Sequence, residues 1–154
     1  MTVERIYTRP AEGAAQREHA QVSVVAGAGI EGDRYFGRHE EPGQNLTLVE
    51  AEEIEAFLDA HQRPYDLSIT GRNVVTRGVR LNELVGREFL LGTLRLRGVE
   101  LCEPCLGLGD VLAAPGLPAA AVVKQFVRRA GLRADVLSGG PLACGARLSV
   151  IDCA

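Results

Sequence analysis

The strongest chemical signal in this sequence is a pair of cysteines, Cys102 and Cys105, with Glu103 and Pro104 between them. Three kinds of chemistry use this spacing: a structural zinc site, a dithiol redox motif, and a single thiolate that binds a soft metal or carries sulfur. The alternative is that both thiols are small apolar groups buried after a strand. Pro104 argues against it, because proline in a sheet marks an edge or the end of a strand.

The remaining cysteines and histidines bear on which of these chemistries applies. A structural zinc site normally adds a second cysteine or histidine pair. Here eight residues separate Cys144 from Cys153, and His19, His39 and His61 are scattered. These features argue against a zinc site, and we expect Cys144 and Cys153 to have no chemical role. A metal-free dithiol redox protein, a single working thiolate, and a binding module with structural cysteines all stay open, although no βαβ unit precedes the pair as in common dithiol proteins.

Two further segments combine glycine with arginine. Asp33 and Arg34 lie in residues 27–37, where four of eleven residues are glycine. Glycines that expose backbone N–H groups beside a guanidinium form an anion site, whereas a simple turn with a solvated arginine is the plainer interpretation. Arg72 and Asn73 follow Gly71 inside an apolar, β-type stretch. They either line a cleft or form a bulge.

The elements that must position these residues are mostly short strands. Alternation and turn residues predict a mainly β fold, a barrel or barrel-like sheet with peripheral helices, rather than a doubly wound fold. We expect residues 1–154 to form one domain. Apolar periodicity predicts helices at 50–61 and 118–130 and a helical turn at 81–85. The predicted strands are 3–9, 21–25, 45–49, 67–79 with a break at Gly71, 134–137 and 147–151, the last two around a turn at 139–141. Residues 88–99 are predicted to form a hairpin in which leucines at 94 and 96 alternate with arginines at 95 and 97.

The composition excludes several classes of function. The formal net charge is −3, whereas proteins that bind nucleic acid normally carry a basic footprint. Aromatic residues make up 5% of the chain, with no tryptophan, so no base-stacking platform is expected. The sequence shows no signal peptide and no apolar run of transmembrane length. We therefore expect a cytoplasmic protein without a nucleic-acid or membrane partner, whose cysteines are reduced.

Taken together and in order, these segments resemble a stand-alone MOSC domain, the module found at the C-terminus of molybdenum cofactor sulfurases. The resemblance runs from about Gly29 to Val150. The segments that carry it are 29–37, 46–50, 72–79, 84–92, the Cys102–Cys105 pair, and 131–134 with the late Gly-Gly turn.

The resemblance implies a β-barrel-like fold with a pocket for the molybdenum cofactor, a pterin dithiolene that carries a phosphate. In the family a cysteine is the key residue, as a sulfur carrier or as a molybdenum ligand. By its Pro-Cys pattern Cys105 matches that cysteine, with Cys102 as the alternate. Related domains belong to enzymes that reduce N-hydroxylated compounds, so the resemblance favours an enzyme that uses molybdenum or transfers sulfur. Because the chain has no flavin, haem or iron–sulfur signature, its electrons or sulfur would come from a separate donor protein.

The resemblance also implies which residues hold the cofactor. Several relatives carry arginine where this chain has Gly71, so the phosphate contact would come from Arg72 or Arg77, or would be missing. The residues expected to bind the cofactor are Asp33, Arg34, Arg72, Asn73 and Arg77.

Overall fold

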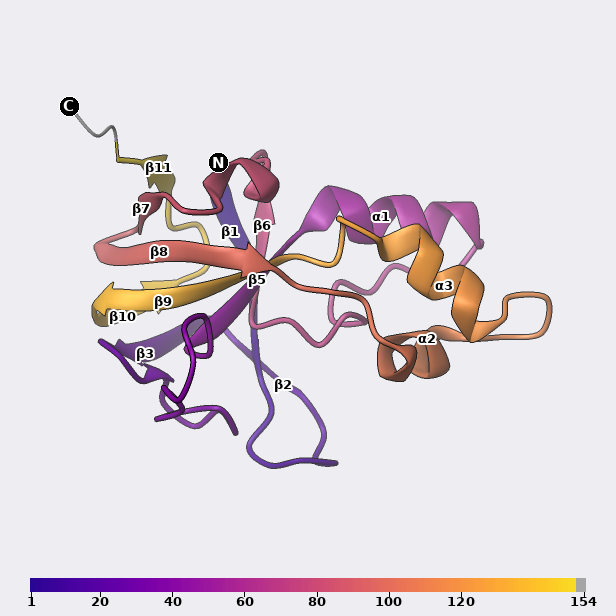
Figure 1. Cartoon of the computed structure of the whole chain (residues 1–154), viewed down its shortest axis with the longest axis horizontal. Helices are drawn as coiled ribbons and strands as arrows, with labels where there is room; N and C mark the ends of the chain where they lie inside the picture. Colours follow the sequence, from indigo (N-terminus) through magenta and orange to yellow (C-terminus); the bar gives the residue numbers. More distant parts are fainter. Residues whose placement is uncertain (152–154) are drawn as a thin grey trace.

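The computed structural model of the chain describes residues 1–151, apart from the side chain of Leu106. Most of the described elements are strands, and the helices follow β5 and β8 (Figure 1). The strands are β1 (Thr2–Thr8), β2 (Arg17–His19), β3 (Gln21–Val25), β4 (Gly29–Ile30), β5 (Leu46–Glu50), β6 (Val74–Arg77), β7 (Glu88–Leu91), β8 (Leu94–Leu101), β9 (Leu132–Ser138), β10 (Gly140–Ala143) and β11 (Leu148–Val150). The helices are α1 (Ala51–Ala60), the 3₁₀ turn η1 (Leu81–Leu84), α2 (Leu106–Leu112) and α3 (Ala119–Phe126).

The strands form a large mixed sheet and a small one. Eight strands follow the order β11-β7-β8-β9-β5-β6-β1-β2, and β10-β3-β4 form the second sheet. In the large sheet β5 and β6 are parallel and the other pairs are antiparallel. The mainly β fold with peripheral helices that the sequence predicts is confirmed.

The described strands do not close into a full barrel. Of the two predicted forms, a barrel or a barrel-like sheet, the closed barrel is therefore wrong. The outer edge of β1 is divided between two neighbours. Its last residues pair with β2, through Ile6 and His19 for example. Its first residues contact the segment before β11 through a bridge between Thr2 and Arg147 and through backbone hydrogen bonds, such as the one from Val3 N–H to the Ala146 carbonyl at 2.8 Å. The large sheet therefore curls until its ends meet over this short segment, and the fold is barrel-like but open.

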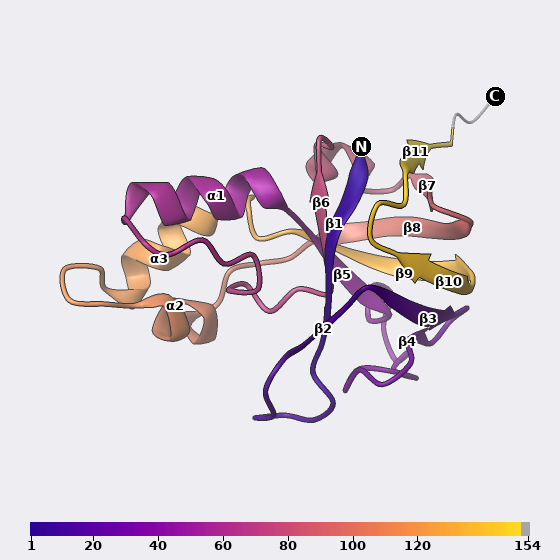
Figure 2. The same ribbon diagram turned by 180° about the vertical axis from the view of Figure 1, so that it is seen from behind.

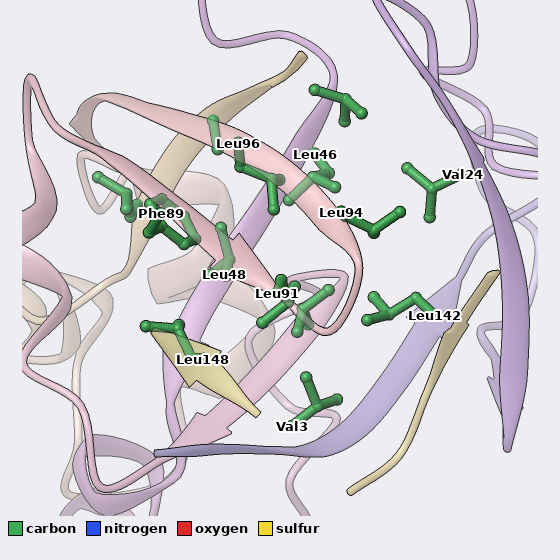
Figure 3. Close-up of a cluster of buried hydrophobic side chains, with 14 of the residues drawn as sticks. Val3, Val24, Leu46, Leu48, Phe89, Leu91, Leu94, Leu96, Leu142 and Leu148 are labelled. Atoms are coloured by element: carbon green, nitrogen blue, oxygen red, sulfur yellow. The ribbon is translucent and has the colours of Figure 1, made fainter. Parts of the chain in front are cut away.

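The inner face of the curled sheet holds the larger apolar core (Figure 3). In β8 the alternation that the sequence predicts is present, since Leu94 and Leu96 are buried and Arg95 and Arg97 are exposed. Leu96 lies opposite Phe89 of β7. Side chains from both sheets contribute to this core, which joins the small sheet to the large one. Those labelled in the figure from β1, β3, β5, β7, β10 and β11 include Val3, Val24, Leu46, Leu48, Leu91, Leu142 and Leu148.

A second apolar core packs the helices against the other face of the sheet. Both views place the three helices together at one end of the molecule, away from β3, β7, β10 and β11 (Figure 1 and Figure 2). Phe57 of α1 and Phe126 of α3 have ring centroids 5.1 Å apart. Cys102 belongs to this core and is 2% exposed. Within residues 1–151 no helix is long and apolar enough to cross a membrane.

Three sequence expectations differ from the structure because tertiary contacts decide them. Residues 67–70 form turns, so the predicted strand is reduced to β6, which starts after Asn73. Helix α3 ends at Phe126 and not at residue 130 as predicted, which leaves Val127 half exposed. The predicted turn at 139–141 is shorter than expected, because Gly140 and Pro141 already belong to β10 and pair with β3.

Candidate functional site

Several of the predicted residues meet in one cavity of about 310 Å³. Strand β1 is antiparallel to β6, and β5 is parallel to β6, so the end of β1 and the starts of β5 and β6 lie at the same edge of the sheet. The loop after β4 covers this edge. We call the space the arginine cavity, because the arginines that line it are Arg9, Arg34, Arg72 and Arg133.

Asp33 organises the loop that carries Arg34. Its carboxylate is 8% exposed and accepts hydrogen bonds from the backbone N–H of Arg9 at 3.0 Å and of Tyr35 at 3.3 Å. The backbone N–H of Arg34 donates to the carbonyl of Arg9 at 2.8 Å. The Arg34 guanidinium lies over the Tyr35 ring, 4.4 Å from its centroid. Asp33 therefore stabilises a turn, as one of the two interpretations of the sequence predicts, and this turn places Arg34 at the cavity.

Asn73 joins three strands at the floor of the cavity. Its side-chain oxygen accepts from the backbone N–H of Thr47 at 3.1 Å, and its side-chain nitrogen donates to the carbonyl of Tyr7 at 3.1 Å. The residue is 8% exposed. Its amide is thus largely occupied by β1 and β5, which indicates a positioning role beside the cavity.

Arg72 lies between the arginine cavity and the cysteine pair. Its Nε donates to the carbonyl of Ala130 at 2.9 Å. Gly131 fixes this carbonyl, because its φ is +111° and a Cβ there would stand 2.1 Å from the Leu48 oxygen. The carbonyl of Gly131 in turn accepts from the backbone N–H of Cys102 at 2.8 Å. The two terminal NH₂ groups of Arg72 make no hydrogen bond within residues 1–151, so they are free to bind a ligand.

The two cysteines of the pair have different environments. Cys102 is buried, and burial raises the pKa of its thiol. Cys105 is exposed at the start of α2, and its pKa is lowered, first by the backbone N–H of Leu108 and also by the Arg72 charge. Neither thiol lines the arginine cavity. The accessible thiol of the pair is therefore Cys105, and the charge of Arg72, which lines the cavity, helps to lower its pKa.

Arg77 is placed elsewhere. Its two terminal nitrogens contact the two oxygens of Glu55 on α1 at 3.0 and 2.9 Å, and its Nε is 3.4 Å from Glu4 of β1. It does not line the arginine cavity. Its contacts indicate that Arg77 joins β6 to α1 and β1, outside the arginine cavity.

Sequence reasoning missed several residues of the cavity. Arg9 follows β1 directly, and Arg133 lies in β9 opposite Thr47. Only the sheet topology brings them together, so no local pattern points to them. Thr70 also lines the cavity, and its Oγ1 is the one buried side-chain polar atom among the described residues that lacks a hydrogen-bond partner. A buried polar group without a partner costs about 1–3 kcal/mol, so a ligand that pairs with Thr70 would gain by it.

We expect iodoacetamide to alkylate Cys105 at lower pH than Cys144. Both thiols are exposed, but the pKa of Cys144 is raised by partial burial whereas that of Cys105 is lowered. Only the thiolate reacts. Peptide-level mass spectrometry over a pH series measures both rates in one sample. Cys102 should stay unmodified while the chain is folded, and equal pH midpoints for Cys105 and Cys144 would contradict the expectation. Cys153 lies outside the described residues.

Comparison with known proteins identifies the family. The MOSC domain model matches residues 36–149, and the chain belongs to the MOSC domain family, as the sequence predicts. MOSC domains are generally associated with the molybdenum cofactor. The matched range begins just after Asp33 and Arg34 and includes Arg72 and Cys105.

Solved structures show the same fold. The YuaD protein from Bacillus subtilis has a TM-score of 0.81 at 22% identity, covering 97% of this chain and 96% of that one. YiiM from Geobacillus stearothermophilus has a TM-score of 0.74 at 17% identity, over 98% and 75% of the two chains. YiiM from Escherichia coli has a TM-score of 0.66 at 17% identity, over 100% and 71%. No curated protein matches the sequence.

Proposed function

We propose that this chain binds the molybdenum cofactor in the arginine cavity and uses Cys105 as its working thiolate. The observation that carries the proposal is the charge of the cavity. Four arginines line it together with one carboxylate, Asp33, which already accepts two backbone N–H groups. Guanidinium groups bind phosphate through paired, charge-assisted hydrogen bonds. A ligand of this cavity is therefore anionic, and the cofactor carries a phosphate.

The residues present fit such a group. The volume of about 310 Å³ lies in the range of small-molecule sites. The unpartnered Oγ1 of Thr70 offers one more hydrogen bond. The cavity also contains the amides of Gln16 and Gln44. The Gln16 nitrogen donates to Ser68 and the Gln44 oxygen accepts from Glu41, so the Gln16 oxygen and the Gln44 nitrogen suit the acceptors and donors on the polar edge of a pterin. Arg72 and Arg133 would hold the phosphate, with Thr70 beside them.

Each of the chain's own residues then has a task. Asp33 and Asn73 hold the loop and the strand ends in place. Arg72 binds the anion and stabilises the thiolate of Cys105, whose pKa it helps to lower. A thiolate is the protein ligand that a soft metal prefers. The bound cofactor would supply two-electron redox chemistry at molybdenum, while the protein supplies binding and electrostatics.

The activity that we propose is the reduction of an N-hydroxylated compound. Two electrons and two protons break the N–O bond, an N–H bond forms, and the oxygen leaves as water. The electrons come from a separate donor protein, since the sequence has no flavin, haem or iron–sulfur signature. This partner and the substrate are part of the proposal.

The exposure of Cys105 favours a second role, that of a sulfur carrier. An exposed thiolate can reach the persulfide of a donor protein, accept its outer sulfur, and release the donor's own thiolate. The two roles share the cavity and Cys105. They differ in whether a persulfide accumulates on Cys105.

Metal and pterin analysis of the purified chain tests the proposal. We expect protein from a host that makes the cofactor to contain molybdenum, together with a pterin that fluoresces once released and oxidised. Mass spectrometry of Cys105 separates the two roles, because an added sulfur atom identifies the carrier. If the purified chain has neither metal nor pterin and also fails to take them up from a cofactor-loaded donor, the proposal is wrong. A metal-free dithiol protein or a binding module would then be the better interpretation.

A further inference from the structure

A second cavity, of about 390 Å³, shares a wall with the arginine cavity. Tyr7 and Gln16 line both spaces. The side-chain nitrogen of Gln16 donates to the carbonyl of Ser68 at 2.9 Å, and this hydrogen bond joins the shared wall to the loop that follows α1. We call this second space the tyrosine cavity, because Tyr7 and Tyr65, two of the three tyrosines in the chain, line it.

The charge of the tyrosine cavity is opposite to that of its neighbour. Glu18 and Asp66 bring two carboxylates, and Arg5 brings one cation. Arg5 and Glu18 form an ion pair at 3.6 Å, with side chains about half exposed, at 46% and 56%. Such a pair contributes little because water screens it, so another cation can take the place of Arg5 beside Glu18. The cavity therefore attracts positive charge.

The aromatic walls of the tyrosine cavity are held in place and uncharged. Burial, followed by the nearby Glu18 carboxylate, raises the pKa of Tyr7 to about 12, so its hydroxyl stays neutral at physiological pH. Tyr65 is 61% exposed, and its hydroxyl donates to Glu55 at 2.9 Å. Glu55 is itself held by Arg77. The Tyr65 ring thus stands at the surface, and the hydrogen bond of its hydroxyl restrains it before any ligand arrives.

The loop that carries the second carboxylate is fixed as well. One oxygen of Asp66 accepts from the backbone N–H of Ser68 at 2.9 Å and from its hydroxyl at 2.6 Å. These bonds use one side of the carboxylate. The other oxygen keeps its capacity to accept from a ligand, since an ionised carboxylate has about four acceptor positions.

From these features we infer that the tyrosine cavity binds an organic cation, an ammonium or guanidinium group on a small apolar body. Aromatic faces attract cations, and they do so together with carboxylates that pair with the charged N–H groups. The next step rests on the proposed function: the tyrosine cavity holds the basic end of the substrate. The reacting end then lies across Tyr7 and Gln16, next to the cofactor.

Three ligands of one shape and different charge test the inference. We expect benzylamine, as benzylammonium, to shift the backbone NMR signals around Tyr65 and Asp66 in the full chain as purified. The neutral benzyl alcohol should bind at least about threefold more weakly, and the anionic benzoate should not shift these signals, because the carboxylates select for positive charge. Equal binding of benzylamine and benzyl alcohol would overturn the inference.

Matched variants locate the site. Asp66→Asn should weaken benzylamine binding about three- to tenfold, whereas Asp59→Asn, an equivalent change on an exposed residue of α1 that lines neither cavity, should leave it unchanged. Tyr65→Leu should weaken binding and Tyr65→Phe should retain most of it, because phenylalanine keeps the aromatic face. Unchanged affinity in both Asp66→Asn and Tyr65→Leu would show that benzylamine binds elsewhere and would overturn the inference.

The titration needs neither molybdenum nor pterin, so it separates this inference from the proposed function. A chain that binds benzylamine but contains no cofactor keeps the cation site and loses the proposed function. A chain that holds the cofactor but does not distinguish the three ligands keeps the proposed function and loses the cation site.

Discussion

Replacing Cys105 with serine is expected to remove the molybdenum-dependent or sulfur-transfer activity of the chain, while replacing Cys144 leaves it intact. Cys105 is exposed and its pKa is lowered, whereas the pKa of Cys144 is raised by partial burial. A serine hydroxyl stays protonated near neutral pH and is a hard donor, so it replaces the thiolate neither as a ligand of a soft metal nor as a carrier of sulfur. We expect a loss of at least about tenfold in activity, the lower end of what disturbing a metal site costs.

The molybdenum and pterin contents of Cys105→Ser distinguish the two proposed roles. If Cys105 is a molybdenum ligand, the metal content per folded chain falls with the activity. If Cys105 carries sulfur, molybdenum and pterin stay in the arginine cavity and only the persulfide is lost. Both contents are measured on the same preparation by metal analysis and by pterin fluorescence.

Two further variants control this experiment. Cys144→Ser is the match for an exposed thiol outside the pair. Cys102→Ser places a hydroxyl in the core between sheet and helices, where burial of an unpaired polar group costs about 1–3 kcal/mol. We therefore expect it to lower the urea midpoint of unfolding more than the activity per folded chain. If Cys105→Ser and Cys144→Ser lower activity equally, Cys105 is not the working thiolate.

The elements that the sequence predicts well are those whose side chains repeat with a clear period. Strand β3 at 21–25 has the predicted bounds, and in the hairpin of β7 and β8 the leucines alternate with arginines as expected. The predicted helix at 50–61 is present as α1. These patterns are local, because each reports which face of one element is buried.

Elements that depend on distant contacts could not be predicted in this way. Helix α2 has seven residues, two of which are glycines, and no side-chain hydrogen bond caps its start. Gly109 packs against Ala119, since a Cβ there would stand 2.7 Å from the Ala119 oxygen. The close contact of α2 with α3 therefore requires this glycine, although local propensity disfavours it inside a helix.

In the candidate site, too, local patterns predict some features and distant contacts decide the others. The motifs at Asp33–Arg34 and Arg72–Asn73 mark real cavity residues, because glycines and polar groups interrupt apolar segments there. The same motifs do not tell which residue faces the ligand and which supports it. The side chains of Asp33 and Asn73 form their hydrogen bonds with neighbouring backbone groups, so both residues support the site. Arg77, on the strand after Arg72, differs from it only through its partners, Glu55 and Glu4.

Replacing Arg72 with glutamine should have the second large effect, on cofactor affinity. Its two terminal NH₂ groups have no hydrogen-bond partner in the described chain, and its charge acts on Cys105. A charge-assisted hydrogen bond contributes about 1.5–3 kcal/mol, so Arg72→Gln should weaken binding of the pterin cofactor roughly ten- to hundredfold. Titration of cofactor-free protein, followed by pterin fluorescence of the retained fraction, measures the change.

The same variant should alter the cysteine. Loss of a positive charge favours the neutral thiol, so the pKa of Cys105 rises and its alkylation by iodoacetamide at neutral pH slows. Arg72→Lys keeps a positive charge but loses the planar fork of donors. It should therefore restore much of the alkylation rate and less of the cofactor affinity. This split distinguishes the electrostatic effect of Arg72 on Cys105 from its contact with the anion.

Arg77→Gln is the matched control, because it removes an identical charge a few residues away. It breaks the contacts of Arg77 with Glu55 and Glu4, and partly exposed ion pairs of this kind contribute up to about 1 kcal/mol each. The urea midpoint should fall slightly, while cofactor affinity and Cys105 reactivity per folded chain stay as they are. If Arg77→Gln weakens cofactor binding as much as Arg72→Gln does, the cofactor responds to the overall charge of the chain, and the arginine cavity is not its site.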